Sequence, residues 1–233
     1  NFYISENSAH SMKWPFFFFF ILWILRTGAQ DGNKTYVDSL LNKLPIQKED
    51  TIKVKTLLYL SEYFSLIDQT KGMKYAEDAA TLSQKIEWLK GIVLSKISIG
   101  RVYWRMGNYK AAISIHKGAL QLAERSEFTE LIPQIIIYVG QDHADGGEFR
   151  EALQHFENAK DLFKKAGNQS QVANCLLMIS WVHDGRGNFP ESSKANIEAL
   201  KIYESLNEHY GISVASANLA IDNIKLEKYP EAV

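Results

Sequence analysis

An interval of 40 residues separates chemically similar side chains through most of this chain, and this repetition restricts its possible folds more than any other feature. The recurring columns are small residues at Gly100, Gly140, Ser180 and Ala220; glycines at Gly107, Gly147 and Gly187; aromatic rings at Tyr109, Phe149 and Phe189; and small residues at Ala112, Ala152, Ala119, Ala159 and Ala199. A unit that recurs in this way buries its apolar face against the next copy, so we expect a stacked array.

Each unit is predicted to consist of two helices. Ile97, Gly100 and Trp104 follow the spacing of one helix face. The glycine column then marks the end of the first helix, because glycine accepts the left-handed backbone that closes a helix. Asn108 and Asn188 follow two of these glycines and are predicted to cap the second helix.

Size differences between the columns predict how the two helices pack. Gly100 and Gly140 would form notches that allow close approach. We expect Ala112 and Ala119, with the ring of Tyr109 beside them, to make the matching face. The sequence therefore predicts an all-α fold, an α-solenoid of antiparallel helix pairs.

The predicted array occupies residues 49–233. Its first unit is a weaker copy in which Leu60 stands in the small column, unless the register slips by one to Ser61. Residues 30–48 are predicted to hold a short lead-in helix. The predicted units cover about residues 49–87, 88–127, 128–167, 168–207 and 208–233, the last one incomplete.

Residues 12–29 have the order of a secretory signal, in which Met12-Lys13 precedes the apolar run from Trp14 to Leu25 and small residues follow. Cleavage after Ala29 would leave the protein exported, on the periplasmic or extracytoplasmic side of the inner membrane. An uncleaved anchor is the alternative, although the run is shorter than the ~20 residues that span a bilayer. Residues 1–11 are predicted to be a leader or a non-native extension.

Composition and motifs exclude several classes of function. The net charge is -1, so no excess of positive charge is available for nucleic acid. The single cysteine, Cys175, lies in an apolar helical run and is predicted to pack as a small hydrophobe. The sequence has no G-x-S-x-G, H-E-x-x-H or phosphate-loop motif, and we therefore expect no enzyme, cofactor or metal site.

The sequence resembles the tetratricopeptide repeat, with the best match at Gly140, Phe149, Ala152, Phe156 and Ala159. The resemblance implies a right-handed superhelix whose concave face, lined by the first helix of each unit, binds a protein or peptide. Two departures are the period of 40 instead of about 34 and the lack of a proline after the second helices. Longer repeats are similar to those in exported sensor regions of bacterial histidine kinases and regulators.

That resemblance places ten residues on the predicted binding face. They are Arg101, Trp104, Arg105, Gln141, Asp145, Trp181, Asp184, Ile221, Ile224 and Lys225. Aromatic and arginine side chains often dominate the binding energy of interfaces. The alternative is that Trp104 and Trp181 only fill gaps between repeats. His143 and His183 could form a metal or pH-sensing pair, although packing at the helix interface explains both.

These features predict an interaction module, the extracytoplasmic sensing or scaffolding part of a larger, membrane-associated signal transduction protein. A free-standing periplasmic assembly factor is the alternative. A third possibility, a hydrolase or lyase on a helical toroid, would depend on Asp145 and Asp184 as its paired acids. The identity of the partner and the oligomeric state are not predicted.

Overall fold

The computed structural model describes residues 30–228, so the predicted leader and signal peptide lie outside the described residues, as do residues 229–233. The chain divides into two compact units, Asn1–Gln47 and Lys48–Val233. In the first unit, helix α2 (Gln30–Lys43) is followed by a short 3₁₀ helix, η1 (Leu44–Ile46).

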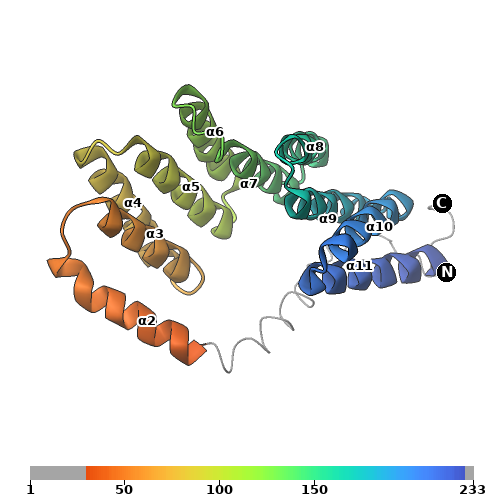
Figure 1. Cartoon of the computed structure of the whole chain (residues 1–233), viewed down its shortest axis with the longest axis horizontal. Helices are drawn as coiled ribbons and strands as arrows, with labels where there is room; N and C mark the ends of the chain where they lie inside the picture. Colours follow the sequence, from red (N-terminus) through yellow and green to blue (C-terminus); the bar gives the residue numbers. More distant parts are fainter. Residues whose placement is uncertain (1–29, 229–233) are drawn as a thin grey trace, which may run out of the picture. The chain divides into compact units, whose positions relative to one another are not determined.

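The second unit is a run of helices in which each one packs against its neighbours in the chain (Figure 1). They are α3 (Thr51–Ser65), α4 (Gln69–Lys85), α5 (Leu89–Arg105), α6 (Tyr109–Arg125), α7 (Ile132–Asp145), α8 (Phe149–Lys165), α9 (Gln169–Gly185), α10 (Phe189–Leu206) and α11 (His209–Lys228). Contacts also join α3 to α5, α5 to α7 and α9 to α11, so first helices of successive pairs are neighbours. Residues 30–228 contain no strand, and the predicted all-α solenoid is confirmed.

Helix ends follow the predicted glycines. Gly107, Gly147 and Gly187 have φ angles of +73°, +82° and +76°, which a side chain would strain. Asn108 caps α6 as predicted, because its Oδ1 accepts from the backbone N–H of Ala111 at 3.2 Å. The predicted cap by Asn188 is wrong, since its side chain makes no capping bond to α10. Its amide nitrogen instead lies 3.5 Å from Nδ1 of His183.

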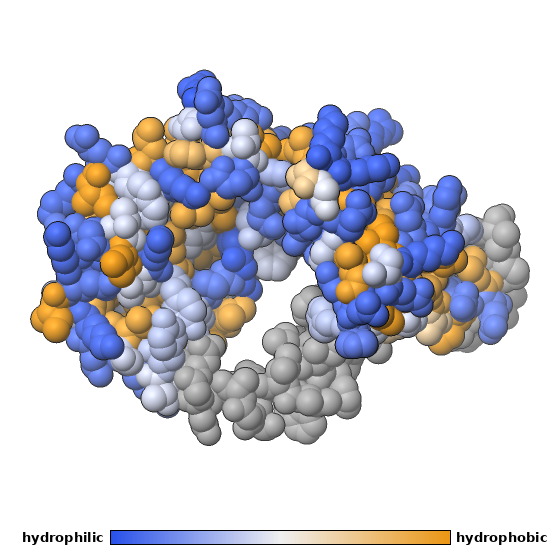
Figure 2. Space-filling model, viewed as in Figure 1, coloured by the Kyte–Doolittle hydropathy of each residue, from blue (hydrophilic) through white to orange (hydrophobic). Residues whose placement is uncertain are grey.

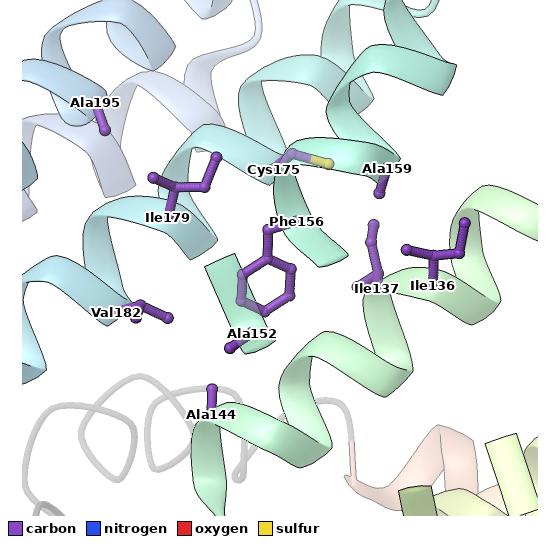
Figure 3. Packing of buried hydrophobic residues seen from close by; sticks show 10 residues of the cluster. All are labelled: Ile136, Ile137, Ala144, Ala152, Phe156, Ala159, Cys175, Ile179, Val182 and Ala195. Atoms are coloured by element: carbon purple, nitrogen blue, oxygen red, sulfur yellow. The ribbon is translucent and has the colours of Figure 1, made fainter. Parts of the chain in front are cut away.

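Phe156 lies at the centre of the core formed by α7, α8 and α9 (Figure 3), and its side chain is fully buried. Gly140 makes room for it, because a Cβ at Gly140 would lie 2.7 Å from the Phe156 ring. Cys175 belongs to the same cluster, and burial raises the pKa of its thiol to about 12. Phe156, together with the small column, thus fixes how closely α7 and α8 approach.

The same notch recurs one unit earlier, where a Cβ at Gly100 would lie 2.4 Å from the His116 ring. The residues that enter the notches are therefore His116 and Phe156. Ala112 and Ala119, predicted for the matching face, are both fully buried on α6. Alanine is too short to fill the space that a missing Cβ opens, whereas a ring four residues further along the helix reaches it.

The first helix pair shows why Leu60 can stand in the small column. Leu60 is the equivalent of Gly100, forty residues earlier, and Ala76 is the equivalent of His116. Both side chains are fully buried. The large residue is thus on the first helix and the small one on the second, the reverse of the later units, so the combined volume is conserved.

From α6 onward, a second recurring contact, which we call a joint, connects each second helix to the following first helix, 26 residues further on. Here His116 meets Asp142, with 2.6 Å between Nδ1 and Oδ2. At the equivalent positions, Phe156 and Val182 belong to one apolar cluster. Asn196 then donates to Asp222 at 2.9 Å. The three joints are therefore polar, apolar and polar in turn.

The His116–Asp142 joint is deeply buried, with side chains 1% and 2% exposed. His116 Nε2 also lies 3.2 Å from the carbonyl oxygen of Ile97. Both ring nitrogens therefore face oxygen atoms, while a neutral imidazole carries only one N–H. Burial raises the pKa of Asp142, although the His116 hydrogen bond opposes this.

Asp222 gives a testable pH dependence. Its carboxylate is 2% exposed and accepts from Ser192 Oγ at 3.0 Å. Burial raises its pKa above the ordinary 3.8. The folded state therefore holds this proton more tightly than the unfolded chain, and the associated stability is lost as pH rises through the folded pKa.

We expect the unfolding free energy of wild type minus that of Asp222→Asn to fall as pH rises from about 3.5 to 7. Urea unfolding followed by circular dichroism at each pH measures this difference. Asp161→Asn, which removes an exposed carboxylate on α8, controls for loss of a surface charge. A difference that rises with pH would contradict the assignment.

Candidate functional site

A hollow of about 260 Å³ opens on the side of the array formed by α3, α5 and α7. We call it the groove, and it is lined by Leu58, Glu62, Leu94, Ile97, Ser98, Arg101, Leu131, Gln134 and Tyr138. All these residues lie on, or next to, the first helices of three successive pairs. Most of the lining is apolar, and four polar or charged groups interrupt it besides the Tyr138 hydroxyl.

The groove lies on the face that the repeat resemblance implied, but mostly at other residues. Arg101 alone among the ten predicted positions lines it. The 40-residue period could have found more, because Leu58, Ser98 and Tyr138 share one column. The prediction concentrated on the last turn of each first helix, whereas the hollow follows the turns before it. Residues three, four and seven positions earlier on the same helix face complete the surface.

Two arginines on α5 converge on one carboxylate of α3. Arg101 Nη2 and Arg105 Nη2 lie 2.7 and 2.8 Å from the same oxygen, Glu62 Oε1. Burial lowers the pKa of Arg105; the neighbouring Glu62 opposes this and the Arg101 charge adds to it. Two cationic groups thus meet one anionic group here, and of the two arginines Arg101 lines the groove.

Tyr138 connects the groove with the buried joint beneath it. The Arg101 guanidinium lies 5.4 Å from the centre of the Tyr138 ring, a distance suited to a cation–π contact. On its other side, Tyr138 stacks on His116 with 5.4 Å between ring centres. The position of the Tyr138 ring therefore depends on the packing of the His116–Asp142 joint.

Several other predicted binding residues pair with each other across successive helix pairs. Trp104 Nε1 donates to Asp145 Oδ2 at 2.6 Å. Lys225 bonds to Asp184, and its ammonium group also lies 5.4 Å from the Phe189 ring centre. These four side chains connect neighbouring helix pairs. For Trp104, this contact fits the alternative that it fills a gap between repeats. Asp145 and Asp184 therefore bond to different partners, Trp104 and Lys225.

The remaining predicted residues lie toward the C-terminal end. Trp181 and Ile224 are 44% and 52% exposed, on α9 and α11. Gln141 and Ile221 are partly buried. Figure 2 shows hydrophobic and hydrophilic residues interleaved over the visible face, so exposed apolar groups do not form one continuous area there.

The Trp104–Asp145 bond gives a second prediction. Burial raises the pKa of Asp145, and the Trp104 hydrogen bond opposes this. Trp104→Phe would leave the carboxylate without that donor, and we expect the unfolding free energy to fall by about 1–3 kcal/mol. Urea unfolding measures the loss. Trp181→Phe, at an exposed position, should change it by less than about 0.5 kcal/mol, and equal losses would contradict the role of the bond.

The two histidines of the proposed pair have separate partners. His143 Nδ1 bonds to Glu148 Oε2 at 2.5 Å, and its ring stacks on His155 with 5.3 Å between centres. His183 is near Asn188 instead. Within residues 30–228 no group of three His, Cys, Asp or Glu side chains is arranged to hold a metal ion. Nor does any helix in that range combine the length and hydropathy of a membrane span.

Two family models match the chain, and both describe the tetratricopeptide repeat. One covers residues 94–126, which include most of α5 and all of α6. The other covers residues 131–205, from the start of α7 nearly to the end of α10. The matched residues include the notches at Gly100 and Gly140 and part of the groove.

Curated proteins and solved structures agree with these matches. Tetratricopeptide repeat protein 29 of Trypanosoma brucei brucei is 21% identical over 64% of this chain, and outer dynein arm-docking complex subunit 4 of Xenopus laevis is 26% identical over 58%. This chain spans 31% and 25% of their lengths.

Two solved structures share the fold at low identity. A Rap protein complexed with competence and sporulation factor has a TM-score of 0.69 at 16% identity, covering 88% of this chain and 61% of its own. A signal transduction ATPase with a tetratricopeptide repeat sensor, from Pyrococcus horikoshii, has a TM-score of 0.68 at 14% identity. The match covers 91% of this chain and 33% of that protein. The chain therefore contains tetratricopeptide repeats, over residues 94–126 and 131–205.

Proposed function

We propose that this array holds a partner protein by a segment that enters the groove on α3, α5 and α7. The observation that carries the proposal is an open, mostly apolar hollow formed by the first helices of three successive pairs. Its volume of about 260 Å³ lies below the roughly 300–1,000 Å³ of pockets for drug-sized ligands. The groove therefore suits a few side chains of a longer chain better than a free small molecule.

Gln134→Trp tests the location, because the larger side chain would fill the groove. The probe is an mRNA-displayed library of short random peptides, selected on the wild-type protein. Gln154→Trp, the same change at an exposed position of α8, is the matched control. We expect the selected peptides to lose binding to Gln134→Trp and to keep it on Gln154→Trp. Equal binding to both variants would place the site elsewhere.

The setting of the array is a separate proposal. We propose that it is the exported sensing or interaction region of a signal transduction protein. Support comes from the charged-then-apolar order of residues 12–25 and from the fold shared with a repeat sensor of a signal transduction ATPase. Mass spectrometry of the N-terminus of the protein from its host tests export. A mature chain that begins near Gln30 would support it, and an intact Met12-Lys13 segment would contradict it.

A scaffold for assembly is the second candidate, and the similarity to a docking-complex subunit favours it. In that setting the groove would hold a constant structural partner instead of a transient signal. The coding sequence distinguishes the two settings. A membrane span with an output domain after the array would support the sensor, and a longer run of repeats without one would support the scaffold.

A further inference from the structure

The charged cluster beside the groove, formed by Glu62, Arg101 and Arg105, is not balanced. Arg101 and Arg105 share one oxygen of Glu62, so two guanidinium groups face a single carboxylate. Among the described residues, Glu62 and Arg101 are the charged ones that line the hollow. One positive charge is therefore uncompensated within this group, in a site where desolvation already makes the Arg105 charge unfavourable.

The hydrogen bonding of these arginines is also incomplete. Arg105 Nε is buried and has no hydrogen-bond partner among the described residues. Glu62 is the carboxylate that opposes the lowering of the Arg105 pKa. Arg101 is the group that a ligand can reach, because its side chain is 31% exposed while that of Arg105 is 17% exposed. Guanidinium groups bind carboxylates with two parallel hydrogen bonds, and the second edge of such a group can accept a further anion.

Most of the hollow that Arg101 lines is apolar. Leu58, Leu94 and Ile97 line the hollow around it, and Tyr138 holds its guanidinium group from one face. A carboxylate that reached Arg101 would therefore bring its neighbouring side chain against aliphatic carbon. An arginine next to apolar walls binds an anion in a partly dry environment, where the ionic hydrogen bond is stronger than in water.

We propose that the groove selects a protein segment in which an Asp or Glu side chain stands next to a branched apolar residue. The acidic group binds Arg101 and balances the second guanidinium charge, and the apolar neighbour enters the hollow. This proposal rests on the function proposed above and adds the chemistry of the partner.

Peptides from the displayed library test it. We expect them to be enriched in Asp or Glu beside Leu, Ile or Val. In a matched pair of peptides, replacing the acidic residue by Gln or Asn should weaken binding by at least about tenfold, because one charge-assisted hydrogen bond is worth about 1.5–3 kcal/mol.

Two variants give opposite expected results with the acidic peptide. Arg101→Gln should weaken binding by at least about tenfold. Glu62→Gln should tighten it, because both guanidinium groups lose their internal partner. Lys160→Gln controls for loss of one positive charge, since Lys160 pairs with Glu157 on α8 outside the groove. Circular dichroism spectra confirm that each variant is folded.

The outcomes separate the two proposals. Peptides that bind, lose binding to Gln134→Trp and contain no acidic preference would overturn the acidic partner and keep the groove. An acidic peptide whose affinity is the same on Arg101→Gln and wild type would also overturn it. Peptides insensitive to Gln134→Trp would overturn the groove itself.

Discussion

Asp142→Val is expected to lower the free energy of unfolding by about 3–5 kcal/mol, because removing one member of a buried pair leaves the other without its partner. Asp142 and His116 are each only 1% exposed, and Asp142 Oδ2 lies 2.6 Å from His116 Nδ1. The variant keeps the imidazole in the core and deprives Nδ1 of its acceptor. Urea unfolding followed by circular dichroism measures the loss.

The chain itself contains the compensating change. Phe156 and Val182 occupy the same two positions one unit later, beside Gly140 in place of Gly100. We expect His116→Phe with Asp142→Val to recover most of the stability lost in Asp142→Val. The two changes should show a coupling energy of at least about 2 kcal/mol in the cycle of single and double variants. Additive losses would contradict the equivalence of the two joints.

The second large effect concerns the notch on α7. Phe156→Ala should cost about 3–5 kcal/mol, because it empties the centre of the core. Gly140→Leu should cost about 1–3 kcal/mol or more, because its Cβ would lie 2.7 Å from the Phe156 ring.

Combining these two changes copies the first unit, where Leu60 and Ala76 hold the equivalent positions and are fully buried. We expect the double variant to be more stable than Phe156→Ala alone, because leucine refills the space that the ring leaves. Thermal and urea unfolding of all four proteins measure the cycle. A double variant less stable than both single variants would show that the notch is not interchangeable between units.

The binding surface was only partly predictable. The period located the first helices, the repeat resemblance implied that Arg101 lies on their concave face, and the structure puts Arg101 in the groove. The period could not show that Trp104 bonds to Asp145 or that Lys225 bonds to Asp184. Such residues have the chemistry of a binding site, and whether they face a partner or a neighbouring repeat depends on the offset between stacked pairs.

The sequence by itself determined the helix pairs, their ends and their stacking, because glycine, alanine and aromatic residues recur at positions where backbone conformation and side-chain volume leave few alternatives. Only the tertiary structure decided which side chain enters each notch, which joints hold a buried carboxylate and where the groove opens. Those features depend on contacts between helices 16 to 43 residues apart. A pattern along one helix gives the face that a residue occupies, and the relative position of the next helix gives its partner.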